Sequence, residues 1–357
     1  MAAMSPSRKR LAASVLFCAI LVLLLLLVGA VMKPARSIVR GDGGAGWGSY
    51  LSKPAGSVDV LFLGNSHIFD SVDPADIWKK RGISSYILGG PTQGPPITEL
   101  YVREALRTQK PKVIVVEMSS ADYDERNFNP QFHQINVGYM PWGLNKLKAA
   151  LFATPAGERT GVLVDWWTYH TRWSEFRARD FNLLGKQTED AFMNGFLPKA
   201  RTQEVSSQPY VLAEKDRPAA DEKIARNMPA LRGIASAARD SGAEVLLLLT
   251  PTGPPNAYSY QLERVASQLQ ADFDNVHALD LSAVGAVPGL SFESDFFDGG
   301  HVSTKGSPKV SAAIADYLAE RMSVPDRRGE TALAEQWQAD IQRHDALLEE
   351  LRARQAK

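Results

Sequence analysis

The sequence contains a single cysteine, Cys18, so it cannot form a disulfide bond within the chain, and its cysteine content says nothing about its compartment. It has no excess of either charge, because 40 Lys and Arg balance 40 Asp and Glu, which argues against nucleic acid as the main partner. It has no ligand-spaced pair of histidines, so we expect no metal site. The histidines are scattered at His67, His133, His170, His277, His301 and His344. We also expect no cofactor, because Gly89–Gly94 matches neither a dinucleotide-binding fingerprint nor a phosphate loop.

A long apolar run is present near the N-terminus. Residues 11–32 carry no charge and are long enough to cross a hydrocarbon core of about 30 Å. Arg8, Lys9 and Arg10 precede the run, which favours a cytoplasmic location for residues 1–10. We predict an uncleaved anchor in the inner membrane, with the rest of the chain facing the periplasm or cell surface. The alternative is a cleaved signal peptide, because Val28-Gly29-Ala30 suits a cleavage site.

Apolar segments alternate with helical patterns after a Gly-, Ser- and Pro-rich linker predicted at residues 33–57. The apolar segments have the length and β-branched content of buried parallel strands, and they are Val58–Leu63, Ser85–Leu88, Lys112–Met118, Glu244–Thr250 and Val276–Leu281. The helical patterns are Pro74–Arg81, Ile97–Gln109, Asp221–Ser241, Tyr258–Ala271 and Lys305–Arg321. This alternation predicts one α/β domain over residues 58–322, with a doubly wound parallel sheet of about five strands.

Two further segments lie outside this alternation. Residues 123–220 are too long for a loop, and we predict a helical insertion there. Its aromatic side chains form either a cap over the site or the core of a small subdomain, and they include Trp142, Trp166, Trp167, Tyr169, Trp173, Phe176 and Phe181. Residues 323–357 are strongly charged with an apolar stripe, which predicts an amphipathic helix that packs on the domain or on a partner.

Two short motifs carry the chemistry that we expect. Gly64-Asn65-Ser66-His67 follows the first predicted strand and places a hydroxyl on a tight turn. Asp298-Gly299-Gly300-His301 supplies a carboxylate and an imidazole more than two hundred residues later. A serine becomes a nucleophile only when a base removes its proton and an acid holds that base in the right tautomer. We therefore predict Ser66 as nucleophile, His301 as base and Asp298 as its orienting partner. The alternative is structural, with Ser66 as a helix N-cap and Asp298 in an Asx-turn.

These two motifs resemble the SGNH (GDSL-like) hydrolase superfamily, in which a Gly-Asp-Ser block carries the nucleophile and Asp-x-x-His closes the domain. The chain has Asn65 where that family usually has Asp, and it matches the last block. The resemblance is closest to the membrane-anchored bacterial branch, which includes the D-alanyl transfer protein of teichoic-acid modification and the alginate O-acetylation proteins. Phe296–Ser303 and Trp167–Trp173 are both similar to that branch. The resemblance implies a flavodoxin-like fold of the SGNH type.

The resemblance also implies an oxyanion hole. The backbone N–H of Ser66 is the expected first donor, and the turn after the second strand supplies the second from Gly90, Gln93 or Gly94. The family's third block usually carries an Asn, whereas residues 117–122 here contain none, so a hydroxyl or a backbone group would replace it. Asn65 and His67 are secondary site candidates.

We therefore expect an extracytoplasmic serine acyltransferase or esterase. Its partners would be an acyl donor, a cell-envelope glycan acceptor and, by the resemblance alone, a membrane-bound O-acyltransferase. Two alternatives remain open at this point: an esterase or deacetylase with the same triad, and an inactive SGNH scaffold that partners the membrane enzyme.

Overall fold

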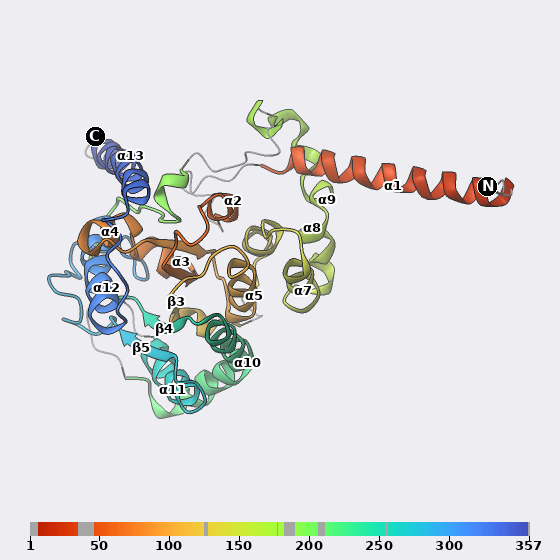
Figure 1. Cartoon of the computed structure of the whole chain (residues 1–357). Coiled ribbons are helices and arrows are strands. Elements are labelled where there is room, and N and C mark those ends of the chain that lie inside the picture. Colours follow the sequence, from red (N-terminus) through yellow and green to blue (C-terminus); the bar gives the residue numbers. More distant parts are fainter. Residues whose placement is uncertain are drawn as a thin grey trace.

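The protein is built around one parallel sheet, from which a long N-terminal helix projects (Figure 1). The computed structural model describes residues 6–34, 46–124, 128–176, 178–181, 190–205, 211–253 and 256–355. All the strands run parallel in the order β2-β1-β3-β4-β5. The strands are β1 (Val60–Gly64), β2 (Ser85–Gly89), β3 (Val113–Glu117), β4 (Glu244–Leu249) and β5 (Val276–Asp280). The prediction of an α/β chain with five parallel strands is confirmed.

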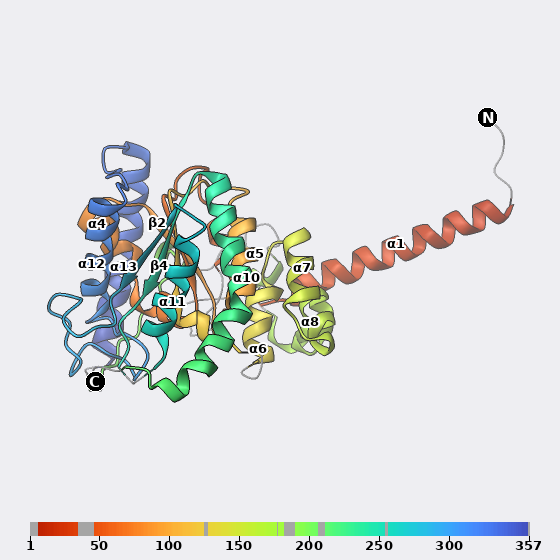
Figure 2. The same ribbon diagram turned by 90° about the horizontal axis from the view of Figure 1, so that it is seen from below.

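Helices cover both faces of this sheet (Figure 2). One face packs against α5 (Pro95–Ala105), α10 (Arg217–Ser241) and α11 (Tyr258–Gln270). The other face packs against α3 (Ser66–Ser71), α4 (Pro74–Arg81), α12 (Ser307–Arg321) and α13 (Thr331–Gln355).

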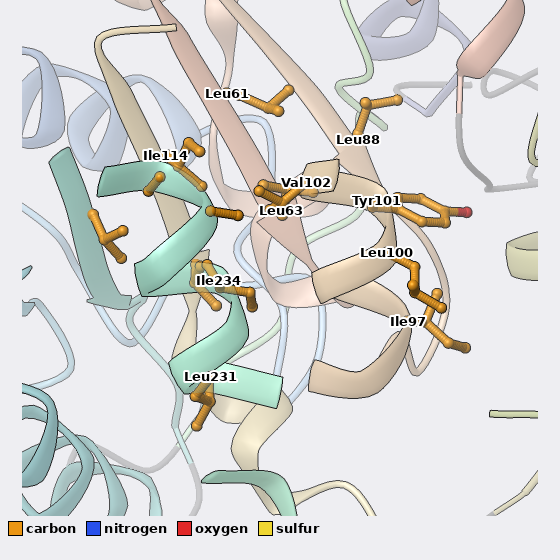
Figure 3. Close-up of a cluster of buried hydrophobic side chains, with 14 of the residues drawn as sticks. Leu61, Leu63, Leu88, Ile97, Leu100, Tyr101, Val102, Ile114, Leu231 and Ile234 are labelled. Atoms are coloured by element: carbon orange, nitrogen blue, oxygen red, sulfur yellow. The ribbon is translucent and has the colours of Figure 1, made fainter. Parts of the chain in front are cut away.

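The strands read as continuous apolar runs because both of their faces are buried. Leu61 and Leu63 of β1 point into the first layer, while Val60 and Phe62 point into the second. Figure 3 shows the first layer, in which side chains of β1, β2 and β3 pack beneath α5 and α10. Each fully buried Leu, Val or Phe contributes about 1.5–3 kcal/mol relative to an exposed one. Burial of both faces holds the strands in place, and with them the edge of the sheet where Ser66 follows β1.

Local capping signals explain why α4 begins and ends where its sequence pattern predicted. Asp73 is the N-cap, and its Oδ1 accepts a hydrogen bond from the N–H of Ala75 at 2.9 Å. Pro74 occupies the first helical position, where its missing N–H costs no hydrogen bond. Gly82 ends the helix in a left-handed conformation with φ of +64°.

The predicted linker at residues 33–57 differs from the structure in its second half. Helix α2 (Trp47–Leu51) buries both Trp47 and Tyr50 in the core. The Tyr50 hydroxyl donates to the carbonyl of Ala105 at 3.2 Å. Large aromatic side chains bury much apolar area, so Trp47 and Tyr50 pack this stretch onto the domain although the residues around them are mainly Gly and Ser. Residues 35–45 lie outside the described residues.

The C-terminal helix α13 packs on the domain, which was one of its two predicted positions. The indole of Trp337 stacks on that of Trp78 in α4, with ring centroids 5.0 Å apart and planes 9° apart. Leu348 is also buried in the second core layer. The helix begins at Thr331, eight residues later than the predicted start at position 323.

Between β3 and α10 lies a stretch of short helices, which we call the aromatic segment (residues 128–181). Its helices include α6 (Pro130–His133), α7 (Leu144–Phe152), α8 (Arg159–Leu163) and α9 (Asp165–Tyr169). The side chains of Trp142, Trp167, Trp173 and Phe181 are exposed. The interpretation that these four form a subdomain core is therefore wrong, and α7 buries Lys146, Ala149 and Ala150 instead.

The N-terminal helix α1 (Pro6–Met32) includes the predicted span at residues 11–32. By length and composition it is apolar enough to cross a membrane.

Candidate active site

Ser66 lies directly after β1, at the carboxyl edge of the sheet. The strand ends at Gly64, whose φ of +142° is a conformation that residues with side chains rarely adopt. A Cβ atom there would lie 2.8 Å from the Cβ of Glu117 on β3. Glycine therefore permits a sharp turn between packed strands. Asn65 then caps α3, since its Oδ1 accepts a hydrogen bond from the N–H of His67 at 3.0 Å.

A tight hairpin brings the second motif to the same edge. Phe296 pairs with Val302 in an antiparallel bridge. The N–H of Phe297 donates to the carbonyl of His301 at 2.8 Å. The loop at the tip of this hairpin places Asp298 and His301 against the first turn of α3.

The structure joins the three predicted residues in one hydrogen-bonded chain. His301 Nε2 lies 2.7 Å from Ser66 Oγ. His301 Nδ1 lies 2.8 Å from Asp298 Oδ1 and 3.0 Å from its Oδ2. The same Oδ1 accepts the backbone N–H groups of Gly300 at 2.8 Å and His301 at 2.9 Å. The predicted Asx-turn at Asp298 is thus present, and the same atom that makes it also faces the imidazole.

The charge on Asp298 fixes the tautomer of His301. Burial acts to raise the pKa of Asp298, but the Gly300 hydrogen bond and the nearby imidazole outweigh it and hold that pKa below its ordinary value. An ionised carboxylate only accepts hydrogen bonds, so the proton of neutral His301 sits on Nδ1. The lone pair on Nε2 is then directed at the Ser66 hydroxyl, which is the arrangement of a general base beside a nucleophile.

His67 forms part of the wall beside this chain. Its ring centroid lies 5.1 Å from that of His301 and 6.0 Å from that of Tyr258. Burial, followed by the charge of His301, lowers the pKa of His67 to about 3. His67 is therefore neutral at physiological pH and contacts the base through its ring.

Asp70 is a residue of this site that sequence reasoning missed. It lies one helical turn after Ser66 on α3, is buried, and has its Oδ2 4.0 Å from His301 Nε2. Lys199 Nζ lies 3.8 Å from the same oxygen. Burial raises the pKa of Asp70 well above its ordinary value, although Lys199 acts in the opposite direction. The i, i+4 spacing from Ser66 is the only signal in the sequence, and it has meaning only once a helix is known to start at Ser66.

Ser119 follows β3 and contacts the turn that carries Ser66. Asn65 Nδ2 donates to Ser119 Oγ at 2.9 Å. Ser119 Oγ in turn donates to the carboxyl group of Glu117. Burial raises the pKa of Glu117 to about 7, while the Ser119 hydrogen bond opposes that rise. A buried network from β3 thus holds the turn that carries Ser66.

The candidate oxyanion donors differ in whether their N–H groups already make a hydrogen bond within the protein. Ser66 is the first residue of α3, so its N–H precedes the helical hydrogen-bond ladder. The N–H of Gly90 donates to the carbonyl of Gly64 at 3.1 Å and is therefore engaged within the sheet edge. Gln93 is buried, and its Nε2 donates to Thr98 Oγ1 at 3.2 Å.

Gly94 has a different role, because a Cβ there would lie 2.5 Å from the Tyr123 ring. Its lack of a side chain makes room for that ring.

Two cavities open beside the turn. A polar cavity of about 120 Å³ is lined by Asn65, Gln93, Ser119 and Asp122, among others. A second cavity of about 190 Å³ is lined mainly by apolar groups, including Ile97, Phe128 and Phe152. Tyr123 lines both cavities, so they adjoin each other at its ring. A polar cavity therefore lies beside Asn65, the neighbour of Ser66, and an apolar cavity shares Tyr123 with it.

Within the described parts of the chain, no three His, Cys, Asp or Glu side chains gather as metal ligands. No family model matches this sequence, and a search of the curated proteins found no match.

Proposed function

We propose that this protein is a serine acyltransferase of the SGNH type that is anchored in the membrane and modifies a cell-envelope polysaccharide. The proposal depends mainly on the hydrogen bonds that connect Ser66, His301 and Asp298. His301 Nε2 lies 2.7 Å from Ser66 Oγ, and His301 Nδ1 lies 2.8 Å from Asp298 Oδ1. The two SGNH-like motifs supply the residues, and the strand order 2-1-3-4-5 is that of flavodoxin-like sheets. Helix α1 supports the proposed anchor, with the aromatic segment as an insertion in the SGNH-like domain.

The proposed reaction has two steps. Ser66 Oγ attacks the carbonyl carbon of an acyl ester or thioester while His301 Nε2 takes the hydroxyl proton. The tetrahedral intermediate collapses as His301 returns that proton to the leaving group, and an acyl-enzyme remains. His301 then takes a proton from an acceptor hydroxyl, whose oxygen attacks the acyl-enzyme, and it returns that proton to Ser66 Oγ as the bond between the acyl group and Ser66 breaks. The carboxylate of Asp298 stabilises the imidazolium in both steps.

The polar cavity supports a sugar as the acceptor. Asp122, Ser120 and Tyr258 line it, and carboxylate and hydroxyl side chains of this kind can pair with the hydroxyls of a glycan. A hydrolase with the same triad would need only water in this space, so the lining favours transfer over hydrolysis. The proposed delivery of acyl groups by a membrane-bound O-acyltransferase rests on the family resemblance.

Labelling of the full chain in detergent with a fluorophosphonate probe tests the nucleophile. We expect labelling on Ser66 in the wild type, no labelling of Ser66→Ala, and a loss of roughly 10³-fold or more in rate for His301→Ala. Ser282→Ala is the matched control, since Ser282 follows β5 at the same edge and binds Asp280 instead. Unchanged labelling of Ser66→Ala would exclude the proposed nucleophile, and absence of labelling in the folded wild type would favour an inactive scaffold.

Transfer and hydrolysis are separated by the fate of the acyl group. The wild type would be incubated with a chromogenic acetyl ester, with and without an oligosaccharide acceptor. We expect the acceptor to increase turnover and to appear acetylated by mass spectrometry. Turnover that yields only free acetate would instead assign an esterase.

A further inference from the structure

An unusual share of exposed apolar side chains belongs to the aromatic segment. Outside α1, most of the large apolar side chains that the described residues expose lie between positions 142 and 181. Helix α7 is the clearest case, because Leu144, Leu147 and Leu151 are all exposed. These residues recur at helical spacing on one face. Its opposite face is buried and carries Ala149. The helix thus turns its apolar side outward, the reverse of a surface helix in a soluble protein.

The same segment holds the end of α1. Lys33 Nζ lies 3.0 Å from Asp165 Oδ1 and donates to the carbonyl of Gly138 at 2.6 Å. Arg172 Nη1 donates to the carbonyl of Met32 at 2.7 Å. These bonds fix the aromatic segment at the point where α1 leaves the proposed membrane. Figure 1 shows α7, α8 and α9 grouped beside that end of the helix, and Figure 2 shows α7 and α8 there.

An apolar cavity shows which part of α1 lies beside the aromatic segment. It measures about 550 Å³ and lies between α1 and the aromatic segment. Val22, Leu25 and Leu26 of α1 line one side, and Trp142 and Leu163 line the other. Leu25 precedes the last residue of α1 by seven positions, or about 10 Å along the helix axis. Side chains that share a cavity with these leucines lie at their level along α1, which is below the surface of a membrane that ends near Met32.

We propose that the exposed face of α7, together with Trp142 and Trp167, lies in the interfacial layer of the lipid bilayer that α1 crosses. The inference rests on the proposed membrane anchor. Helix α7 has nine residues and spans about 13 Å, so it is too short to cross the bilayer and lies along its surface. Tryptophans are typical of this layer, where the apolar ring and the polar N–H are both accommodated.

Lipid is the occupant that the geometry favours over a protein partner. The cavity wall includes α1 itself, whose residues in this stretch are surrounded by acyl chains when the helix spans a membrane. Lys148 lies exposed among the leucines of α7, where its stem can lie along the apolar layer while the amine reaches the headgroups. Two contacts, one spanning and one interfacial, would then hold the domain in a fixed orientation to the membrane.

Site-specific fluorescence on the full chain tests the contact. After Cys18→Ser, single cysteines would be introduced by Leu144→Cys and Leu151→Cys and labelled with an environment-sensitive dye. The matched control is Val284→Cys, an exposed apolar position on the loop after β5. The proteins would be reconstituted in vesicles of phosphatidylcholine and phosphatidylglycerol that contain nitroxide-labelled lipid. We expect several-fold stronger quenching at both leucine positions than at position 284, and protection there from aqueous iodide.

Equal quenching at all three positions would overturn the proposal. Dyes that stay accessible to iodide in pure lipid but become protected in native membranes would assign this face to a membrane protein, which also overturns it. The readout does not depend on the reaction at Ser66, so its failure is distinguishable from a failure of the proposed function.

Discussion

Two of the histidine–carboxylate pairs in the described residues differ in their surroundings, since one lies at the sheet edge and the other in the interior. His301 binds Asp298 through Nδ1 at 2.8 Å and Ser66 through Nε2 at 2.7 Å, and a quarter of its side-chain surface is exposed. His344 of α13 binds Asp73 through Nε2 at 2.7 Å and is fully buried. The pair distances are nearly equal, so the carboxylate alone does not set the role of the histidine.

The second ring nitrogen makes the difference. Nδ1 of His344 binds another carboxylate, Asp345, at 2.8 Å. Burial acts to lower the pKa of His344, but the hydrogen bonds to Asp73 and Asp345 outweigh it and raise that pKa. An imidazolium between two carboxylates ties α13 to the N-cap of α4. In His301 the second ring nitrogen instead contacts the hydroxyl of Ser66, and in this position the imidazole can act as a base.

The largest expected effect comes from Asp298→Asn, which breaks the edge pair. The amide Nδ2 would face His301 Nδ1 and favour the other tautomer, whose Nε2–H cannot accept the Ser66 proton. We expect the fluorophosphonate labelling rate to fall by roughly 10³–10⁴-fold while the fold persists. Asp280→Asn is the control, since Asp280 lies at the same edge and caps Ser282. A loss of less than tenfold for Asp298→Asn would show that Asp298 does not orient the base.

The interior pair should respond in stability and not in chemistry. His344→Ala leaves the buried Asp73 without its partner, which costs about 3–5 kcal/mol of unfolding free energy. Urea denaturation measures this loss, and labelling of the remaining folded protein should proceed at the wild-type rate. His277→Ala is the matched control, because the His277–Glu244 pair at 2.9 Å is well exposed and should contribute less than about 1 kcal/mol. Equal losses for both variants would contradict the assignment of His344 as a buried bridge.

The pH dependence of stability checks the cause of that loss. The folded-state pKa of His344 is raised, so its contribution is fully present below the unfolded pKa of about 6.5 and is lost as pH rises through the folded value. In His344→Gln, this decrease in stability above pH 6.5 should be smaller than in the wild type. A steeper decrease in the variant would reverse the sign and exclude a charged His344.

The sequence was sufficient for the sheet and for the residues that now form the hydrogen-bonded chain. Apolar runs such as Lys112–Met118 predict strands that are buried on both faces, and Asp298 and His301 are three positions apart in one motif. Other features depend on tertiary packing and could not be predicted from the sequence pattern. Nothing in the Gly-rich stretch before β1 indicates that Tyr50 reaches the core, and the commitment of the Gly90 N–H to Gly64 follows from strand pairing.

Asp70 shows the same limit within the site, and it gives the smallest expected effect. Its carboxyl group lies 4.0 Å from His301 Nε2, while Asp298 binds the other nitrogen directly. Burial raises the pKa of Asp70 well above its ordinary value, which favours the neutral form more than at an exposed carboxyl group, and Asp70→Asn keeps the shape of that form. We expect the labelling rate of this variant to stay within about tenfold of the wild type, since the neutral form loses no charge. A loss comparable to that of Asp298→Asn would mean that an ionised Asp70, paired with Lys199, acts on the imidazolium as a second carboxylate, and the edge site would then resemble the two-carboxylate arrangement around His344.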